Sequence, residues 1–99
     1  MRVADYIAQS LARLGINHVF LVTGGGAMHL NDAFGRENKL TTVCCHHEQS
    51  CAMAAEAYAR LLGRPAVLNV TSGPGGINAI NGVFGAYTDS ITTIGIESV

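Results

Sequence analysis

Glycine-rich turns, two histidines, a glutamate and a serine each follow a short apolar run, in positions where a ligand could bind. The turns are Gly24-Gly25-Gly26 and Ser72-Gly73-Pro74-Gly75-Gly76, and the ionisable cluster is His46-His47-Glu48. Glycine lets the backbone approach a ligand closely, and the start of a following helix offers free N–H groups. Neither turn carries the Gly-Lys-Ser/Thr of a P-loop or the spaced glycines of a dinucleotide site. Tight strand-to-helix turns without a ligand are therefore the alternative interpretation.

Glu48 is the residue best placed for acid–base chemistry. It stands between a predicted strand and an alanine-rich helix, where partial desolvation favours the protonated carboxylic acid. Such a group can donate a proton to, or share one with, a nitrogen heterocycle. The alternative is a first-turn glutamate that only stabilises the helix dipole. Of the two adjacent histidines, His46 and His47, we expect one to pack inward and the other to line the site.

Three cysteines, Cys44, Cys45 and Cys51, surround this cluster. Zinc sites need cysteines two to four residues apart and a second half-site, and neither is present. The number is odd and neighbouring cysteines pair poorly, which disfavours disulfides. The sequence therefore predicts buried small thiols and no metal site.

Alternating helical and strand-like segments must position these residues. Helical spacing predicts helices over residues 3–14, 27–34, 47–62 and 77–87, and apolar runs predict strands over 18–22, 40–45, 66–71 and 91–96. The first helical stripe comprises Val3, Tyr6, Ile7, Leu11 and Leu14, and Gly15 is expected to end that helix. Helical crossovers between strands indicate an α/β fold, one open parallel sheet of about four strands with helices on both faces. In such sheets ligands bind beyond the carboxyl ends of the strands, where the glycine turns and Glu48 stand.

Composition excludes several classes of protein. The 99 residues form one small domain, and 48% hydrophobic against 13% charged residues exclude a disordered chain. A net charge of −1 leaves no basic surface for nucleic acid. We expect no membrane span, no signal peptide and a cytoplasmic location.

Two segments resemble the cofactor-binding motifs of thiamine-diphosphate enzymes. One is His47-Glu48-Gln49-Ser50 with the helix that continues to Arg60, and the other is Thr71-Ser72-Gly73-Pro74-Gly75-Gly76-Ile77-Asn78 followed by Ala86-Tyr87-Thr88-Asp89-Ser90. In this order they resemble the pyrimidine-binding (PYR) domain of the acetolactate synthase and pyruvate decarboxylase-like superfamily. The likeness extends over essentially the whole chain.

The resemblance implies a role for each motif. Glu48 would hydrogen-bond the aminopyrimidine N1′ of thiamine diphosphate and favour the tautomer that activates the cofactor toward a 2-oxo acid. The cofactor-binding residues implied are Gly24, Gly25, Gly26, Glu48, Ser72, Gly73, Pro74, Gly75 and Asn78, and His47 would line the substrate. The function implied is the N-terminal part of an acetolactate synthase-like enzyme, a decarboxylase or carboligase.

The chain also departs from the family pattern. Thr92 stands where the family has proline, and Ile96-Glu97-Ser98-Val99 replaces a more polar end. The Gly-Asp-Gly segment that binds Mg²⁺ and the diphosphate does not occur in the sequence. The resemblance therefore implies a truncated PYR domain over residues 1–99 that is inactive alone. Its implied partners are a diphosphate-binding domain or subunit, which would hold Mg²⁺, and further copies in a homo-oligomer.

Two other classes remain as alternatives. One is a non-catalytic α/β interaction module that kept the fold and lost the chemistry. The other is a flavodoxin-like nucleotide-binding domain, for which no phosphate motif is present.

Overall fold

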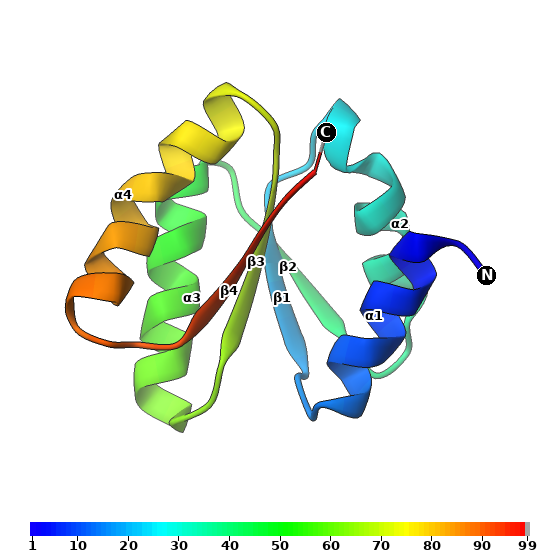
Figure 1. Cartoon of the computed structure of the whole chain (residues 1–99), viewed down its shortest axis with the longest axis horizontal. Helices are drawn as coiled ribbons and strands as arrows, with labels where there is room; N and C mark the ends of the chain where they lie inside the picture. The colour runs from blue at the N-terminus through cyan, green and yellow to red at the C-terminus, as the bar shows by residue number, and fades with distance from the viewer. Residues whose placement is uncertain (99) are drawn as a thin grey trace.

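The chain folds into a parallel β-sheet with helices on both faces (Figure 1). The computed structural model describes residues 1–98. The elements, in chain order, are α1 (Val3–Arg13), β1 (His18–Leu21), the short 3-10 helix η1 (Gly25–Ala27), α2 (Met28–Arg36), β2 (Thr41–Cys44), α3 (Glu48–Leu62), β3 (Ala66–Thr71), α4 (Pro74–Thr88) and β4 (Thr93–Ser98). The predicted α/β class and the four-stranded parallel sheet are confirmed.

The strands lie in the order β2-β1-β3-β4. Val19 of β1 pairs with Thr42 of β2 on one side and with Val67 of β3 on the other. The pairing of β3 with β4 begins at Ala66 and Thr93. All these pairs are parallel, so the carboxyl ends of the strands meet at one edge of the sheet.

The two faces of the sheet carry different helix pairs. Helices α1 and α2 cover one face, and α3 and α4 cover the other (Figure 1). Strand β3 is buried on both sides: Val67 packs into the α1/α2 core and Leu68 into the α3/α4 core. This explains why β3 reads as a continuous apolar run rather than an alternating one.

Small residues bring α3 and α4 into close contact. A Cβ on Gly82 of α4 would lie 2.5 Å from the Cβ of Ala52 and 3.0 Å from the backbone nitrogen of Met53. No real side-chain atom fits there, so glycine at position 82 sets the distance between the helices. Gly75, Ala79 and Ala86 continue the same buried line on α4.

On the other face of the sheet, ion pairs join α1 to α2. Arg2 contacts Asp5 at 3.0 Å and Asp32 at 2.9 Å, and Arg36 contacts the same two carboxylates at 2.9 and 3.1 Å. The hydrogen bonds from Arg2 lower the pKa of Asp5 to about 2. These four side chains therefore form a charged patch on the outside of this layer.

Several predicted details of the elements are wrong. Helix α4 begins at Pro74, three residues before the predicted start, because Gly73 takes a φ of +69° and Pro74 begins the helix at its first position. The stripe predicted for α1 is right at Ile7 and Leu11, which lie on the core side, and wrong at Val3, Tyr6 and Leu14, which are exposed. Ala4 and Ala8 complete the buried side. A prediction based on large apolar side chains overlooks these two alanines. Strand β4 starts at Thr93, two residues late.

The predicted end of the first helix is confirmed, because Gly15 follows α1 with a φ of +86°. On α3, Arg60 bonds Glu56 at 2.9 Å. Within residues 1–98, no helix combines the length and apolar character needed to cross a bilayer.

Candidate functional site

The chain changes direction across the sheet between β1 and β3. These strands are neighbours, yet the helix after β1 packs on one face and the helix after β3 on the other (Figure 1). In open α/β sheets, ligands bind beyond the carboxyl ends of the strands at such a switch point, and we use the word crevice for this place in the fold. The loops here span residues 22–24 and 72–73, where the sequence predicts a ligand site.

Thr71 ties the two loops together. Its Oγ1 accepts a hydrogen bond from the backbone N–H of Gly26 at 3.1 Å. A Cβ on Gly24 would lie 2.6 Å from the Cβ of Thr71, so only glycine permits this approach. Directly after β1, the backbone N–H of Val22 donates to the carbonyl oxygen of Asn69 in β3 at 3.3 Å. The first glycine turn is thereby fixed against the end of β3.

Glu48 is the first residue of α3, directly after β2 and the residues Cys45–His47. His47 caps the helix: its Nδ1 accepts the backbone N–H of Gln49 at 3.0 Å. Because Nδ1 acts as an acceptor here, a neutral His47 carries its proton on Nε2. The Glu48 side chain is half-buried at the start of this helix.

The first turns of α4 meet the Glu48 carboxylate. Asn78 donates from Nδ2 to Oε1 of Glu48 at 3.3 Å. The other oxygen, Oε2, lies 3.5 Å from where a Cβ on Gly75 would stand. A Cβ at position 75 would be in ordinary van der Waals contact with this oxygen, so glycine leaves the space beside it free. Glu48, Gly75 and Asn78 come together although thirty residues separate the glutamate from the asparagine.

The remaining predicted residues lie around this centre at different depths. Gly25 has open space where a side chain would be, and Ser72 is half-buried in the loop. Gly73 and Pro74 are exposed. His46 and His47 are both exposed, so the expectation that one of them packs inward is wrong. The turn from β2 to α3 projects beyond the sheet edge, and this leaves both rings in solvent.

Sequence reasoning missed two residues of the crevice. The predictions assign no contact to Thr71, although its hydroxyl holds the first glycine turn. Asn69 is fully buried in β3 and donates from Nδ2 to Oδ1 of Asn31 on α2 at 2.7 Å. Its own Oδ1 has no hydrogen-bond partner among the described residues. An asparagine inside an apolar strand was the available signal, because buried amides need partners.

The cysteines do not behave as one group. Cys44 is exposed, Cys45 is half-buried and only Cys51 is buried, so burial of all three is wrong. Burial, and then the neighbouring Cys45 thiol, raise the pKa of Cys51 to about 12. Cys51 is therefore a neutral packing residue of α3 and a poor nucleophile. In the part of the chain that the structure describes, no group of three or more His, Cys, Asp or Glu side chains is arranged to hold a metal.

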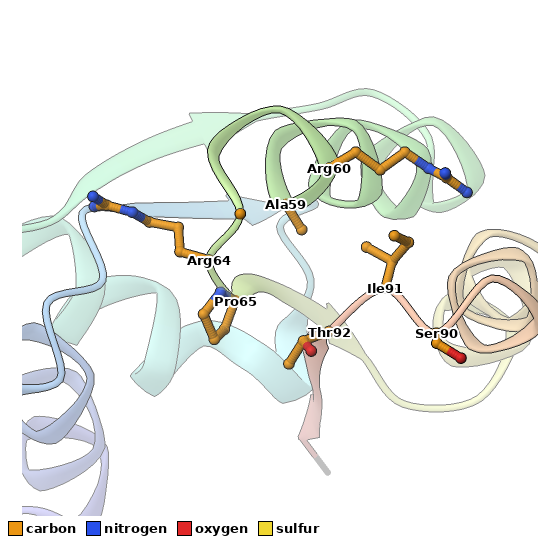
Figure 2. A pocket seen from close by; sticks show the side chains of 8 residues that line it. Ala59, Arg60, Arg64, Pro65, Ser90, Ile91 and Thr92 are labelled. Atoms are coloured by element: carbon orange, nitrogen blue, oxygen red, sulfur yellow. The ribbon is translucent and has the colours of Figure 1, made fainter.

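A separate hollow of about 290 Å³ lies at the opposite edge of the sheet, near the end of α3 (Figure 2). Arg60, Arg64 and Thr92 are among its lining residues, and Figure 2 shows the two guanidinium groups pointing away from each other. Arg60 already bonds Glu56 and Asp89. The hollow lies at the amino ends of the strands, away from Glu48, so the crevice remains the candidate site.

Comparisons with known proteins give one matching family and several similar proteins. The family described as "Thiamine pyrophosphate enzyme, N-terminal TPP binding domain" matches residues 1–98. Acetolactate synthase 2, chloroplastic, from Brassica napus is 40% identical over 93 residues, which are 94% of this chain and 15% of that protein. The acetolactate synthase large subunit of Buchnera aphidicola subsp. Schizaphis graminum is 39% identical over 94 residues, 95% of this chain and 16% of that protein. The chain thus spans about one seventh of the length of these relatives.

Proposed function

The chain belongs to the family of thiamine pyrophosphate enzymes as their N-terminal TPP binding domain, and on this premise we propose that it binds the aminopyrimidine end of thiamine diphosphate at Glu48. The whole protein would then act on 2-oxo acids, by decarboxylation or carboligation, as an acetolactate synthase-like enzyme. The names of the relatives support this reaction class. The observation that carries the proposal is the half-buried Glu48 carboxylate at the sheet edge, bonded by Asn78 and left open by Gly75.

The residues at the crevice fit the aminopyrimidine. Asn78 occupies Oε1 of Glu48, which leaves Oε2 to hold a proton shared with a ring nitrogen. A Cβ on Gly75 would fill the space beside Oε2, so this glycine supports the fit. When bound, thiamine diphosphate supplies the electron sink for bond changes next to a carbonyl.

The surrounding residues orient Glu48 and shape the crevice. His47 caps α3 and so fixes the first turn that carries Glu48, while its Nε2–H can donate to a substrate oxygen. Gly24, Gly25 and Gly26 let the first loop run close to the ligand, and Thr71 holds that loop in place. Ser72, Gly73 and Pro74 form the facing loop.

The proposal includes partners for the parts of the cofactor that Glu48 does not reach. A diphosphate-binding domain or subunit would hold Mg²⁺ and the diphosphate, because the Gly-Asp-Gly segment of the family does not occur in these 99 residues. We propose further that the 99-residue chain is inactive alone and works in a homo-oligomer.

Calorimetric titration tests whether the chain needs a diphosphate-binding domain to bind the cofactor tightly. Thiamine diphosphate with Mg²⁺ is titrated into the chain alone and into the chain mixed with a diphosphate-binding domain. We expect weak binding to the chain alone and tight binding to the mixture. Tight binding to the chain alone would contradict the need for a partner.

Glu48→Gln and the control Glu37→Gln separate the Glu48 role from general charge effects. Glu37 lies at the end of α2 and accepts the N–H of Lys39 at 3.3 Å, which a glutamine oxygen can also accept. If the mixture turned over 2-oxo acids equally well with Glu48→Gln, the alternative of an interaction module without catalytic role would be favoured.

A further inference from the structure

Glu97, near the end of β4, lies against the first turn of α4. In the parallel pairing of β3 with β4, Glu97 stands opposite Val70, one residue before the end of β3. A Cβ on Gly76 would lie 2.7 Å from the Cδ of Glu97 and 2.8 and 3.0 Å from its two carboxylate oxygens. The Glu97 carboxylate thus occupies the space that a side chain at position 76 would need.

The start of α4 has no negative charge of its own. The cap residue Gly73 has no side chain, Pro74 has no N–H, and the first turn contains no acidic residue. The first N–H groups of a helix have no partner within the helix and carry a partial positive charge. The Glu97 carboxylate, which comes from β4, therefore stabilises this turn in the position where it lies.

Two carboxylates flank this one turn of helix. Gly75 leaves room for Glu48, whose Oε2 lies 3.5 Å from the place of a Cβ there, and Gly76 leaves room for Glu97. Successive residues of an α-helix are rotated by about 100°, so the two carboxylates lie on different sides of the turn. Asn78 is three residues after Gly75, hence on the same side, and it bonds Glu48. Glu97 thus contacts the turn on the side away from the candidate site.

We propose that Glu97 is a positioning residue for the candidate site, because it fixes the first turn of α4 against β4 and so sets where Asn78 meets Glu48. The inference rests on the proposed function only for the chemistry of Glu48, since the contact between Glu97 and Gly76 is made without cofactor. Removing or displacing the Glu97 carboxylate then loosens the bond from Asn78 and changes the orientation of Glu48.

A double-mutant cycle of Gly76→Ala and Glu97→Ala tests the contact in the 99-residue chain. The added methyl group must displace the Glu97 carboxylate, which is the flexible end of a side chain, while alanine favours a helix over glycine. We expect Gly76→Ala to shift the NMR resonances of the Asn78 side-chain amide, in the direction that Glu48→Gln shifts them, without lowering the urea midpoint of unfolding. In the Glu97→Ala background the same substitution should cause a much smaller shift. Equal shifts in the two backgrounds would overturn the proposal.

The matched control is Gly85→Ala on the same helix. A Cβ there would lie 3.3 Å from Oε1 of Glu56, so this substitution also meets a carboxylate, but nine residues further along α4. We expect Gly85→Ala to leave the Asn78 amide resonances in place. A shift as large as that of Gly76→Ala would show that any change on α4 reaches Asn78, and it would contradict a specific role for Glu97.

Glu97→Gln tests the consequence for the cofactor, because it removes the charge and keeps the size of the side chain. The readout is the exchange of the thiazolium C2 proton of saturating thiamine diphosphate, with Mg²⁺ and a diphosphate-binding domain. We expect Glu97→Gln to slow the exchange by about 10- to 100-fold, as for a misplaced catalytic group, and Asp89→Asn, at the other end of α4, to leave it unchanged.

The two measurements separate this inference from the proposed function. An exchange rate that Glu97→Gln leaves unchanged, although Glu48→Gln slows it, would overturn the positioning role and leave the role of Glu48 intact. The amide shifts are measured without cofactor, so they decide whether Glu97 positions Asn78 even if Glu48→Gln has no effect on the exchange.

Discussion

The two helix layers of this chain are held together in different ways. On the α1/α2 layer, Arg2, Asp5, Asp32 and Arg36 form a charged surface. On the α3/α4 layer, Gly82 packs on Ala52, and the outward side of α4 is apolar. Glu48 and Asn78, which form the centre of the candidate site, both come from the α3/α4 layer. The α1/α2 layer is thus joined by a network of ion pairs, whereas close packing of small residues joins α3 to α4, the layer that carries the candidate site.

The largest effect is expected where the α3/α4 layer is tightest. A methyl group on Gly82 would overlap Ala52 and the backbone of α3, which cannot move aside cheaply. Gly82→Ala should therefore lower the free energy of unfolding by about 1–3 kcal/mol, measured by urea denaturation. A Cβ on Gly35 of α2 meets nothing within 4 Å, so Gly35→Ala should leave stability unchanged or raise it by up to about 1 kcal/mol. Equal effects of the two substitutions would remove the proposed difference between the layers.

A smaller effect is expected from the charged layer, and it depends on pH. The Arg2 bonds lower the pKa of Asp5 to about 2 and also lower the pKa of Asp32. A lowered pKa means that the carboxylates stabilise the fold fully above about pH 4, their ordinary range, and that this stabilisation is lost as the pH falls toward 2. The effect is small because the groups are exposed.

The Asp5→Asn, Asp32→Asn double variant measures this contribution. Urea denaturation at several pH values should give a shallower loss of stability between pH 4 and 2 than in the unchanged chain. The matched control is Asp89→Asn, which removes a carboxylate from the other layer, next to Arg60. If the double variant lost stability with pH as steeply as the unchanged chain, the ion pairs would not contribute.

The sequence was sufficient for the fold. Uninterrupted apolar runs predicted the parallel strands, and glycine turns after them predicted loops at the carboxyl edge of the sheet. Both depend on local patterns, which a sequence displays directly. The start of α4 was missed because Gly73-Pro74-Gly75-Gly76 resembles a turn by composition, although Pro74 fits the first position of a helix.

The contacts within the site could not be predicted in the same way. The bond from Asn78 to Glu48 and the bond from Gly26 to Thr71 join distant segments. Their existence depends on the distance between α3 and α4, which Gly82 sets, and on the approach of Gly24 to β3. Such distances follow from tertiary packing and leave no periodic signal. The roles of Glu48, His47 and the glycine turns, and the cytoplasmic location, remain predictions.

The central claim is that Glu48 activates the cofactor. Its most direct test is the rate at which the thiazolium C2 proton of thiamine diphosphate exchanges with solvent. NMR measures this rate at cofactor saturation, in a mixture of the chain, Mg²⁺ and a diphosphate-binding domain. We expect Glu48→Gln to slow the exchange by about 10²–10⁴-fold, the usual contribution of a positioned acid–base group, and Glu37→Gln to leave it unchanged. An unchanged exchange rate in Glu48→Gln would contradict the account.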